Sequence, residues 1–174
     1  TKLESYLESK GINYAPRFLS TTELSFYEGE AEVSGSINTI LVALDSQKDN
    51  RVYPIKDKII EGTYLENNKE GILIGSALAH NIGLKLNSVV TLLLKGKEGF
   101  IETVDLPIIG IFEVDDVVVN SNQVLIDYEF LNSLLYLDDY VSEYGINLNS
   151  KNALTGANRL EKQFSTLKGA SSDF

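Results

Sequence analysis

Residues 71–94 constrain the fold more than any other part of the sequence. The stretch opens with the apolar run Ile-Leu-Ile at 72–74 between two glycines, and such a run with two β-branched residues is typical of a short strand buried on both faces. A turn at Asn87 and Ser88 then leads into Val-Val-Thr-Leu-Leu-Leu at 89–94, which predicts a second strand.

A short helix is predicted between these two strands. Leu78 and Ile82 are four residues apart, so they share one helical face that can pack onto a sheet. Ser76 is the expected N-cap, and Gly83 can supply the left-handed conformation in which helices often end. The unit carries no catalytic motif, and packing is sufficient to explain it.

The rest of the chain alternates between helical and strand patterns. The predicted elements begin with a helix over 2–10 and a long hairpin with strands at 21–27 and 33–44. After the central unit come an alternating stretch over 100–104, an apolar strand over 106–112 and a second seam over 115–123 that is apolar at 117–119 and then polar. The last elements are a strand over 124–126, a helix capped by Asp127, a strand over 145–148 and a helix over 154–167. This order predicts an α+β fold. We expect residues 1–46 and 121–174 to form an α+β part, a sheet with helices on one face, and residues 47–120 to form an inserted β-rich part.

Composition excludes several classes of function. The net charge is −10, and the three arginines are Arg17, Arg51 and Arg159, so the chain lacks the basic surface that nucleic-acid binding needs. The same negative charge disfavours docking onto an anionic membrane surface. With no cysteine, the chain has no disulfide, thiolate nucleophile or thiolate metal site. It also has no methionine, and we interpret it as a piece of a larger protein.

Few residues are candidates for chemistry. His80 is the only histidine, and its place on the predicted helix favours a solvent-facing or partly buried position. The pairs Asp115-Asp116 and Asp138-Asp139 offer oxygen ligands for a divalent ion, but neither follows the spacing of a calcium loop, so exposed turns are the favoured interpretation. We therefore expect no catalytic residue, cofactor or metal site.

Two groups of residues are candidates for contact with a partner. Four tyrosines, Tyr128, Tyr136, Tyr140 and Tyr144, surround the helix that follows Asp127, and tyrosine is frequent at interfaces; the alternative is that they cover their own domain. The second group is an exposed, glycine-rich hairpin tip, whose alternative is an ordinary turn: Lys95, Gly96, Lys97, Glu98, Gly99 and Phe100.

An ordered set of segments resembles the MacB-like periplasmic core domain of ABC-transporter permeases, the family that includes LolC, LolE and the FtsX-like proteins. The segments are Ile60-Glu61-Gly62, Ile72-Leu73-Ile74-Gly75 with Leu78-Ala79 and Ile82-Gly83-Leu84, Val89-Val90-Thr91-Leu92, Ile108-Ile109-Gly110-Ile111-Phe112, and Val124-Leu125-Ile126-Asp127 with Leu134-Leu135. The resemblance extends over nearly the whole chain and is specific from Ile60 to Leu135.

The resemblance implies a non-catalytic domain on the periplasmic or extracytoplasmic side of the inner membrane, tethered by flanking transmembrane helices. It implies that ATP is hydrolysed by a separate nucleotide-binding subunit or domain, that a second permease subunit is present, and that a periplasmic partner or lipoprotein cargo is handled. Two rigid parts that move when the membrane helices shift are the expected mechanism.

Two interpretations from other classes stay open. One is a free-standing binding module built on a small β-barrel, with the helix that begins at Ser76 as a plug. The other is a metal-dependent enzyme that uses the paired aspartates.

Overall fold

The computed structural model describes residues 1–28, 33–67, 69–96, 99–148 and 155–162. The chain divides into two compact units, one formed by Thr1–Asn13 with Ile146–Phe174 and the other by Tyr14–Gly145. Among the described residues, no helix is long and apolar enough to cross a membrane.

The smaller unit contains helix α1, Lys2–Ser9. The helix begins with a capping box, because the Thr1 hydroxyl accepts a hydrogen bond from the Glu4 amide at 3.2 Å and the Glu4 side chain returns to Thr1. Leu7 is its buried residue, and Gly11, with φ of 62°, follows the predicted helix in the left-handed conformation common after a helix end. Residues 155–162 are helical, and the remaining residues of the predicted 154–167 helix lie outside the described part.

The larger unit holds a mixed sheet and short helices, so the predicted α+β class is confirmed. The strands are β1 (Asn13–Glu28), β2 (Val33–Leu44), β3 (Ile59–Gly62), β4 (Ile72–Gly75), β5 (Val89–Lys95), β6 (Ile101–Phe112), β7 (Gln123–Asp127) and β8 (Glu143–Asn147). The helices are α2 (Ser46–Asp49), the 3-10 helix η1 (Ile55–Lys58), α3 (Ser76–Ile82), α4 (Val117–Asn122) and α5 (Tyr128–Leu135).

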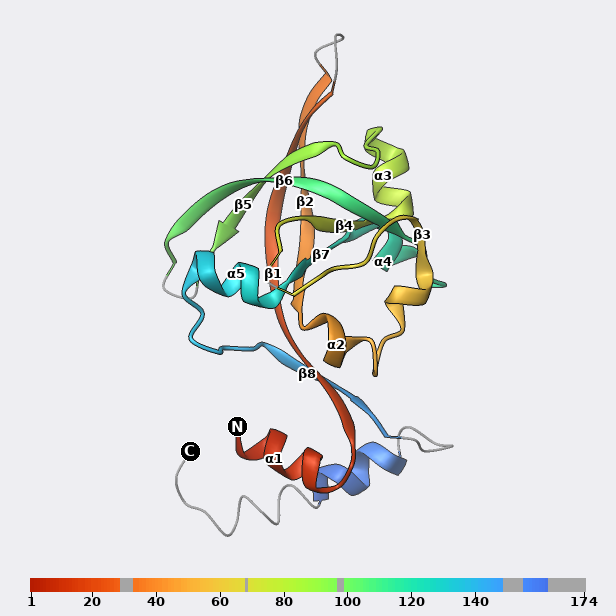
Figure 1. The fold of residues 1–174 in the computed structure, drawn as a ribbon, viewed down its shortest axis with the longest axis vertical. Helices are drawn as coiled ribbons and strands as arrows, with labels where there is room; N and C mark the ends of the chain where they lie inside the picture. Colours follow the sequence, from red (N-terminus) through yellow and green to blue (C-terminus); the bar gives the residue numbers. More distant parts are fainter. Residues whose placement is uncertain (29–32, 68, 97–98, 149–154, 163–174) are drawn as a thin grey trace. The chain divides into compact units, whose positions relative to one another are not determined.

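Six of the strands pair in a closed ring. The order β2-β7-β4-β6-β5-β1 closes because β1 also pairs with β2, while β3 adds to β6 and β8 to β1 (Figure 1). The ring includes strands from both predicted parts, the α+β part (1–46 and 121–174) and the β-rich part (47–120). The predicted boundaries, at 46/47 and 120/121, differ from the limits of the compact units, at 13/14 and 145/146. The two-part division stays a prediction.

Three ring strands, β2, β4 and β7, have runs of successive apolar residues because both of their faces are buried. In β2, β4 and β7, alternate side chains enter two different hydrophobic clusters, one on each face of the sheet. Leu41, Ala43, Ile72, Ile74, Val124 and Ile126 belong to the larger cluster, and Val42, Leu44, Leu73 and Leu125 to the smaller one. The prediction that residues 72–74 are buried on both faces is therefore confirmed.

The β1–β2 hairpin extends well beyond the strands beside it (Figure 1), and its outer half follows a different pattern. The register places Ser25 opposite Ser36. From Ser34 to Asn38 the side chains on the face of the smaller cluster are polar, and Ser34, Ser36 and Asn38 are exposed. At Ile40 the sequence becomes continuously apolar, and there β2 begins to pair with β7.

The strand–helix–strand unit over residues 72–95 forms as predicted, with one correction. The N-cap of α3 is Gly75, and no side chain caps this helix, so Ser76 is its first residue and not its cap. A glycine is required there because a Cβ on Gly75 would lie 2.2 Å from the carbonyl oxygen of Asn120. Gly83 ends the helix with φ of 74°, as expected.

Residues 117–122 form helix α4, so the prediction of an extended seam over 115–123 is wrong at its centre. Three consecutive valines favour a strand by propensity. The helix forms nonetheless because the Asp116 carboxylate caps it and because it packs against α3. Asp127 caps α5 as predicted, with its Oδ1 accepting a hydrogen bond from the Phe130 amide at 3.0 Å.

Candidate functional site

A groove of about 700 Å³ lies on the sheet over β1, β2, β5 and β6. The register places Ser25 beside Ser36 on one side and beside Thr91 on the other, and Thr91 opposite Asp105, so these four residues form one row across the strands. The opposite face of the same strands is the larger hydrophobic cluster. The groove is thus built on a rigid floor.

The lining of the groove combines acidic and hydroxyl groups with a few apolar ones. Glu23 and Asp105 are its charged residues, and both are exposed. The Thr91 hydroxyl donates a hydrogen bond to Asp105 Oδ1 at 2.5 Å, which fixes the carboxylate. The other lining residues are Ser25, Phe26, Tyr27, Ser34, Gly35, Ser36 and Val89. The sequence analysis did not find this groove, because alternating small polar residues are also the ordinary pattern of a solvated sheet face.

The predicted contact segment connects β5 to β6. Lys95 pairs with Ile101, and the Gly96 amide donates to the Phe100 carbonyl at 3.0 Å, so hydrogen bonds join the two described ends of the segment. The Phe100 ring packs over Gly96 and stays 39% exposed. Lys97 and Glu98 lie outside the described residues, and Gly99 is exposed with φ of 83°. Its role as a contact site stays a prediction.

The four predicted tyrosines fall into two pairs. Tyr128 is buried and donates a hydrogen bond to the Tyr140 carbonyl at 2.9 Å, and Tyr144 packs against Tyr14 with ring centroids 6.2 Å apart. Burial raises the pKa of Tyr128 to about 12, with smaller contributions from nearby acidic groups. Tyr136 and Tyr140 are 73% and 51% exposed. One pair therefore covers its own domain, and the other is accessible to a partner.

The residues considered for chemistry do not converge. His80 is exposed on α3, as expected. Asp138 and Asp139 follow one another in left-handed conformations, with φ of 50° and 60°, in a turn after α5. Within the described ranges, no three His, Asp or Glu side chains are placed to hold a metal ion together.

Asp116 has a structural role that a substitution can test. Its Oδ1 accepts hydrogen bonds from the amides of Val118 at 2.8 Å and Val119 at 3.2 Å. We expect Asp116→Ala to lower the free energy of unfolding by about 1 kcal/mol, as loss of an N-cap does, and Asp115→Ala to change it by less than about 0.5 kcal/mol. Urea denaturation of both variants measures the difference. Equal losses in the two variants, together with stabilisation of the wild type but not of the variants by Mg²⁺ or Ca²⁺, would instead favour a metal site.

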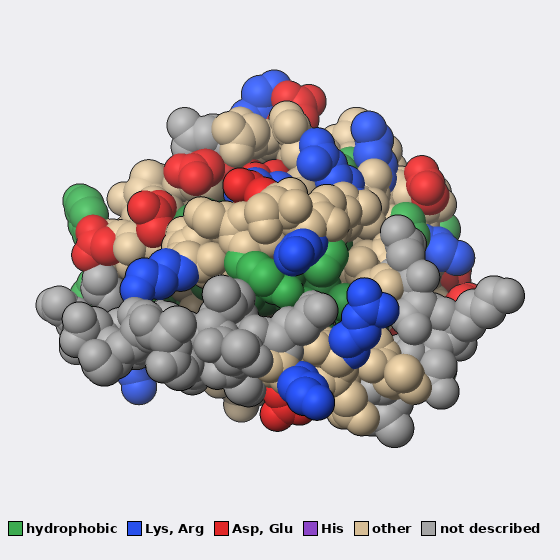
Figure 2. Space-filling model, turned by 90° about the horizontal axis from the view of Figure 1, so that it is seen from below, with side chains coloured by type: hydrophobic (Ala, Val, Ile, Leu, Met, Phe, Trp, Pro, Cys, Tyr) green, Lys and Arg blue, Asp and Glu red, His purple; other side chains and the backbone are tan. Residues whose placement is uncertain are grey.

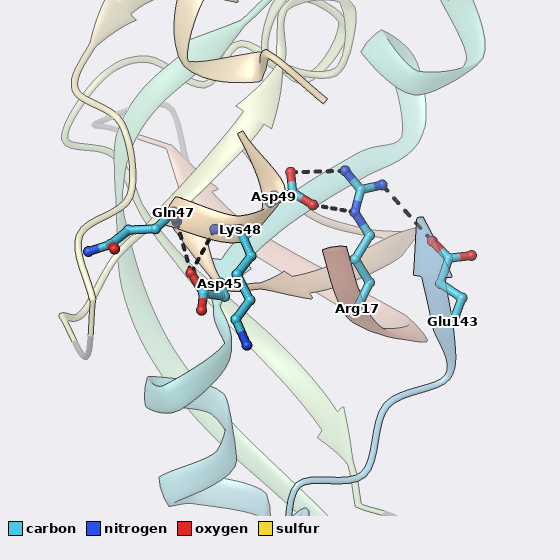
Figure 3. Close-up of polar contacts among 6 residues, drawn as sticks. All are labelled: Arg17, Asp45, Gln47, Lys48, Asp49 and Glu143. Carbon is cyan, nitrogen blue, oxygen red and sulfur yellow. Dashed lines mark hydrogen bonds and ion pairs between the residues drawn. The ribbon is translucent and has the colours of Figure 1, made fainter. Parts of the chain in front are cut away.

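A buried ion pair outside the groove is the other notable polar site. Arg17 of β1 binds Asp49 of α2 through two hydrogen bonds, Nε to Oδ1 at 2.6 Å and Nη2 to Oδ2 at 3.0 Å (Figure 3). The guanidinium also lies 3.7 Å from the centre of the Tyr53 ring, and its Nη1 is 4.0 Å from Glu143 of β8. Asp49 is fully buried and Arg17 is 8% exposed.

The local sequence around Asp49 explains how α2 presents it. Asp45 caps this short helix, since its Oδ1 accepts hydrogen bonds from the amides of Gln47 at 2.9 Å and Lys48 at 3.0 Å (Figure 3). The helix ends at Asp49, whose carboxylate then faces Arg17. Residues 45–50 are a polar stretch of the sequence, and nothing local indicates that Asp49 pairs with an arginine 32 positions away.

Burial governs the ionisation of this cluster. It raises the pKa of the Asp49 carboxyl above its ordinary value, and the hydrogen bond and charge of Arg17 oppose that rise. Burial also raises the pKa of Tyr64, whose hydroxyl has no hydrogen-bond partner among the described residues. The ion pair connects α2, in the segment that follows β2, to β1. We interpret its role as stabilisation of the fold.

The face drawn in Figure 2 is mixed in charge. On the face in Figure 2, Lys and Arg side chains lie among Asp and Glu side chains and around a small hydrophobic area. The acidic character of the chain is therefore uneven, and the lining of the groove contains no Lys or Arg.

Comparison with known proteins indicates the fold. No protein-family model matches the sequence, and no curated protein matches it. The structure is similar to the crystal structure of the periplasmic region of MacB from Actinobacillus actinomycetemcomitans, with a TM-score of 0.55 and 13% sequence identity, over 90% of this chain and 67% of that one. The chain therefore has a MacB-like periplasmic-region fold.

Proposed function

We propose that this chain is an extracytoplasmic domain of an ABC-transporter permease. The observation that carries the proposal is the similarity of fold to the periplasmic region of MacB over 90% of the chain. The resemblance of residues 60–135 to the same family was found from the sequence alone, and it supports the same conclusion.

In this proposal the domain is non-catalytic and couples movement of membrane helices to partner or cargo handling. The nucleotide is hydrolysed by a separate subunit or domain, a second permease subunit completes the transporter, and the domain lies on the periplasmic side of the membrane. Release of lipoproteins, as by LolC and LolE, and MacB-type export are the two systems that the family resemblance offers. We also propose that Lys95–Phe100, the turn between β5 and β6, contacts the partner.

The sequence of the complete gene product tests the context. A permease requires apolar segments of about 20 residues on both sides of the chain, long enough to span a bilayer. The second candidate, a free-standing β-barrel module, is favoured by the closed ring of six strands and requires no such segments. A complete protein without them would overturn the permease proposal.

Labels on the complete protein test how movement is transmitted. The sequence predicts two moving parts, whereas the strand pairing between them favours residues 14–145 moving as one body. We therefore expect spin labels at Lys95 and Ser133 to keep a constant separation through the ATP cycle, while each changes its distance to a label at the membrane surface. The chain has no cysteine, so Lys95→Cys and Ser133→Cys label cleanly.

Thr21 and Ser133 form the control pair, since both belong to the predicted α+β part. A change at Lys95–Ser133 alone would show that the two predicted parts move separately. Constant distances at every pair, including those to the membrane, would contradict the coupling role.

A further inference from the structure

We propose that the groove over β1, β2, β5 and β6 binds an extended peptide segment that carries Lys or Arg side chains. The inference goes beyond the transporter context, because it concerns the chemistry of the groove and can be tested on the chain itself. Three features support it: the charge of the groove, the size of its lining side chains, and its position on the sheet.

Charge complementarity identifies the partner as cationic. The charged side chains of the groove are Glu23 and Asp105, both exposed and without a cation among the lining residues. The sequence adds to the negative charge, because every charged residue between Arg17 and Lys48 is acidic, a range that holds β2 and the part of β1 beyond Arg17. A cationic ligand is attracted to such a surface and an anionic one is repelled.

The orientation of Asp105 is set by the protein. Its Oδ1 accepts the 2.5 Å hydrogen bond from the Thr91 hydroxyl, which belongs to the neighbouring strand β5. A carboxylate fixed in this way loses little side-chain entropy when an ammonium or guanidinium group binds it. Glu23 lies two residues along β1 from Ser25, and therefore on the same face of the sheet as the row that contains Asp105, so two cationic side chains of one extended chain can reach both carboxylates.

Small side chains allow a peptide backbone to come close to the sheet. Ser25, Ser36 and Gly35 line the floor, and the hydroxyls of the two serines can donate to and accept from peptide groups. Val89, 55% exposed, and Tyr27, 69% exposed, add apolar contact area beside this floor. An open, hydroxyl-lined strip over four strands fits an extended chain better than a compact small molecule.

The experiment titrates the full chain with three synthetic peptides of equal length, made of alternating Thr with Lys, Gln or Glu. Amide NMR shifts locate the site, and their dependence on peptide concentration gives Kd. We expect the Lys peptide to bind, with shifts at residues 23–27, 34–36 and 89–91, and to bind more weakly as salt rises, because the charges are exposed. The Gln and Glu peptides are expected to bind more weakly or not at all.

Variants separate local from overall charge. Glu23→Gln with Asp105→Asn is expected to raise Kd for the Lys peptide by roughly 2- to 25-fold, since each exposed ion pair contributes roughly 1.4- to 5-fold. Glu102→Gln with Glu129→Gln removes the same charge outside the groove and should have a clearly smaller effect. Ser36→Lys places a cation on the exposed floor and should abolish binding. Circular dichroism confirms that each variant is folded.

Three results would overturn the proposal. One is equal binding of the Lys and Gln peptides, because charge would then not select the ligand. Another is a set of shifts that lies away from the groove, or equal effects of the two double variants. The last is the appearance of the same shifts when the protein alone is concentrated, which would identify a second copy of the chain as the occupant.

Discussion

Arg17→Ala is expected to lower the free energy of unfolding by about 3–5 kcal/mol, the usual cost of removing one partner of a buried ion pair. The Asp49 carboxylate is fully buried and receives both of its strong hydrogen bonds from Arg17. Without the guanidinium, this charge is left in a medium that solvates it poorly. Chemical denaturation at neutral pH measures the loss.

A double variant is the control for this prediction. Arg17→Met combined with Asp49→Leu removes both charges and fills the space with apolar groups, so its cost should be far smaller than that of Arg17→Ala. A loss below about 1 kcal/mol for Arg17→Ala would show that solvent reaches Asp49 and that the pair is not truly buried.

The pH dependence distinguishes lost charge pairing from lost packing on Tyr53. Burial already raises the pKa of Asp49 above its ordinary value of 3.8, and Arg17→Ala removes the hydrogen bond and charge that oppose the rise. In this variant the folded state binds a proton more readily than the unfolded state, so stability falls as pH rises between the unfolded and the folded pKa. The deficit of the variant against the wild type should therefore shrink as pH is lowered from 7 towards 3.8. A deficit independent of pH would assign the loss to packing.

Phe112→Ala is expected to lower the free energy of unfolding by about 3–5 kcal/mol. Phe112 is the last residue of β6 and is fully buried in the smaller hydrophobic cluster, with Leu44 of β2, Leu73 of β4 and Leu125 of β7. Ile55 and Leu65, on the segment between β2 and β4, belong to the same cluster. A cavity at this position thus loosens that segment, and thermal unfolding should show a midpoint lower by roughly 6–20 °C.

Ile60→Ala is the matched control. Ile60 belongs to β3, which pairs with β6 beside Phe112, but its side chain is 52% exposed. Its replacement should change the free energy of unfolding by less than about 0.5 kcal/mol. Similar losses for both variants would contradict the assignment of Phe112 to the core of this cluster.

Much of the local structure follows from sequence patterns. The strand at 72–74, the end of α3 at Gly83, the cap at Asp127 and the long β1–β2 hairpin all form as expected. In each case the pattern and the local chemistry agree. The prediction fails at α4, where three valines favour a strand by propensity but a capping aspartate and packing against α3 determine a helix.

The sites are less predictable than the fold. The segment Lys95–Phe100 was identified by its glycines and charges, which report exposure and not a partner. Sequence patterns predict neither the groove nor the Arg17–Asp49 pair, because each is formed by residues far apart in the chain. Strand pairing brings Glu23 of β1 and Asp105 of β6 to one groove. The fold of the segment after β2 brings Asp49 of α2 to Arg17 of β1.

Local sequence patterns were sufficient to predict most of the strands, the helices α1, α3 and α5 and the α+β class, and composition excluded thiol chemistry, because these depend on interactions between residues close in the chain or on composition. The tertiary structure alone decided that six strands close into one ring, that a fully buried carboxylate finds an arginine, and that acidic and hydroxyl side chains meet in one groove. These features depend on which strands become neighbours, and local sequence does not encode that choice.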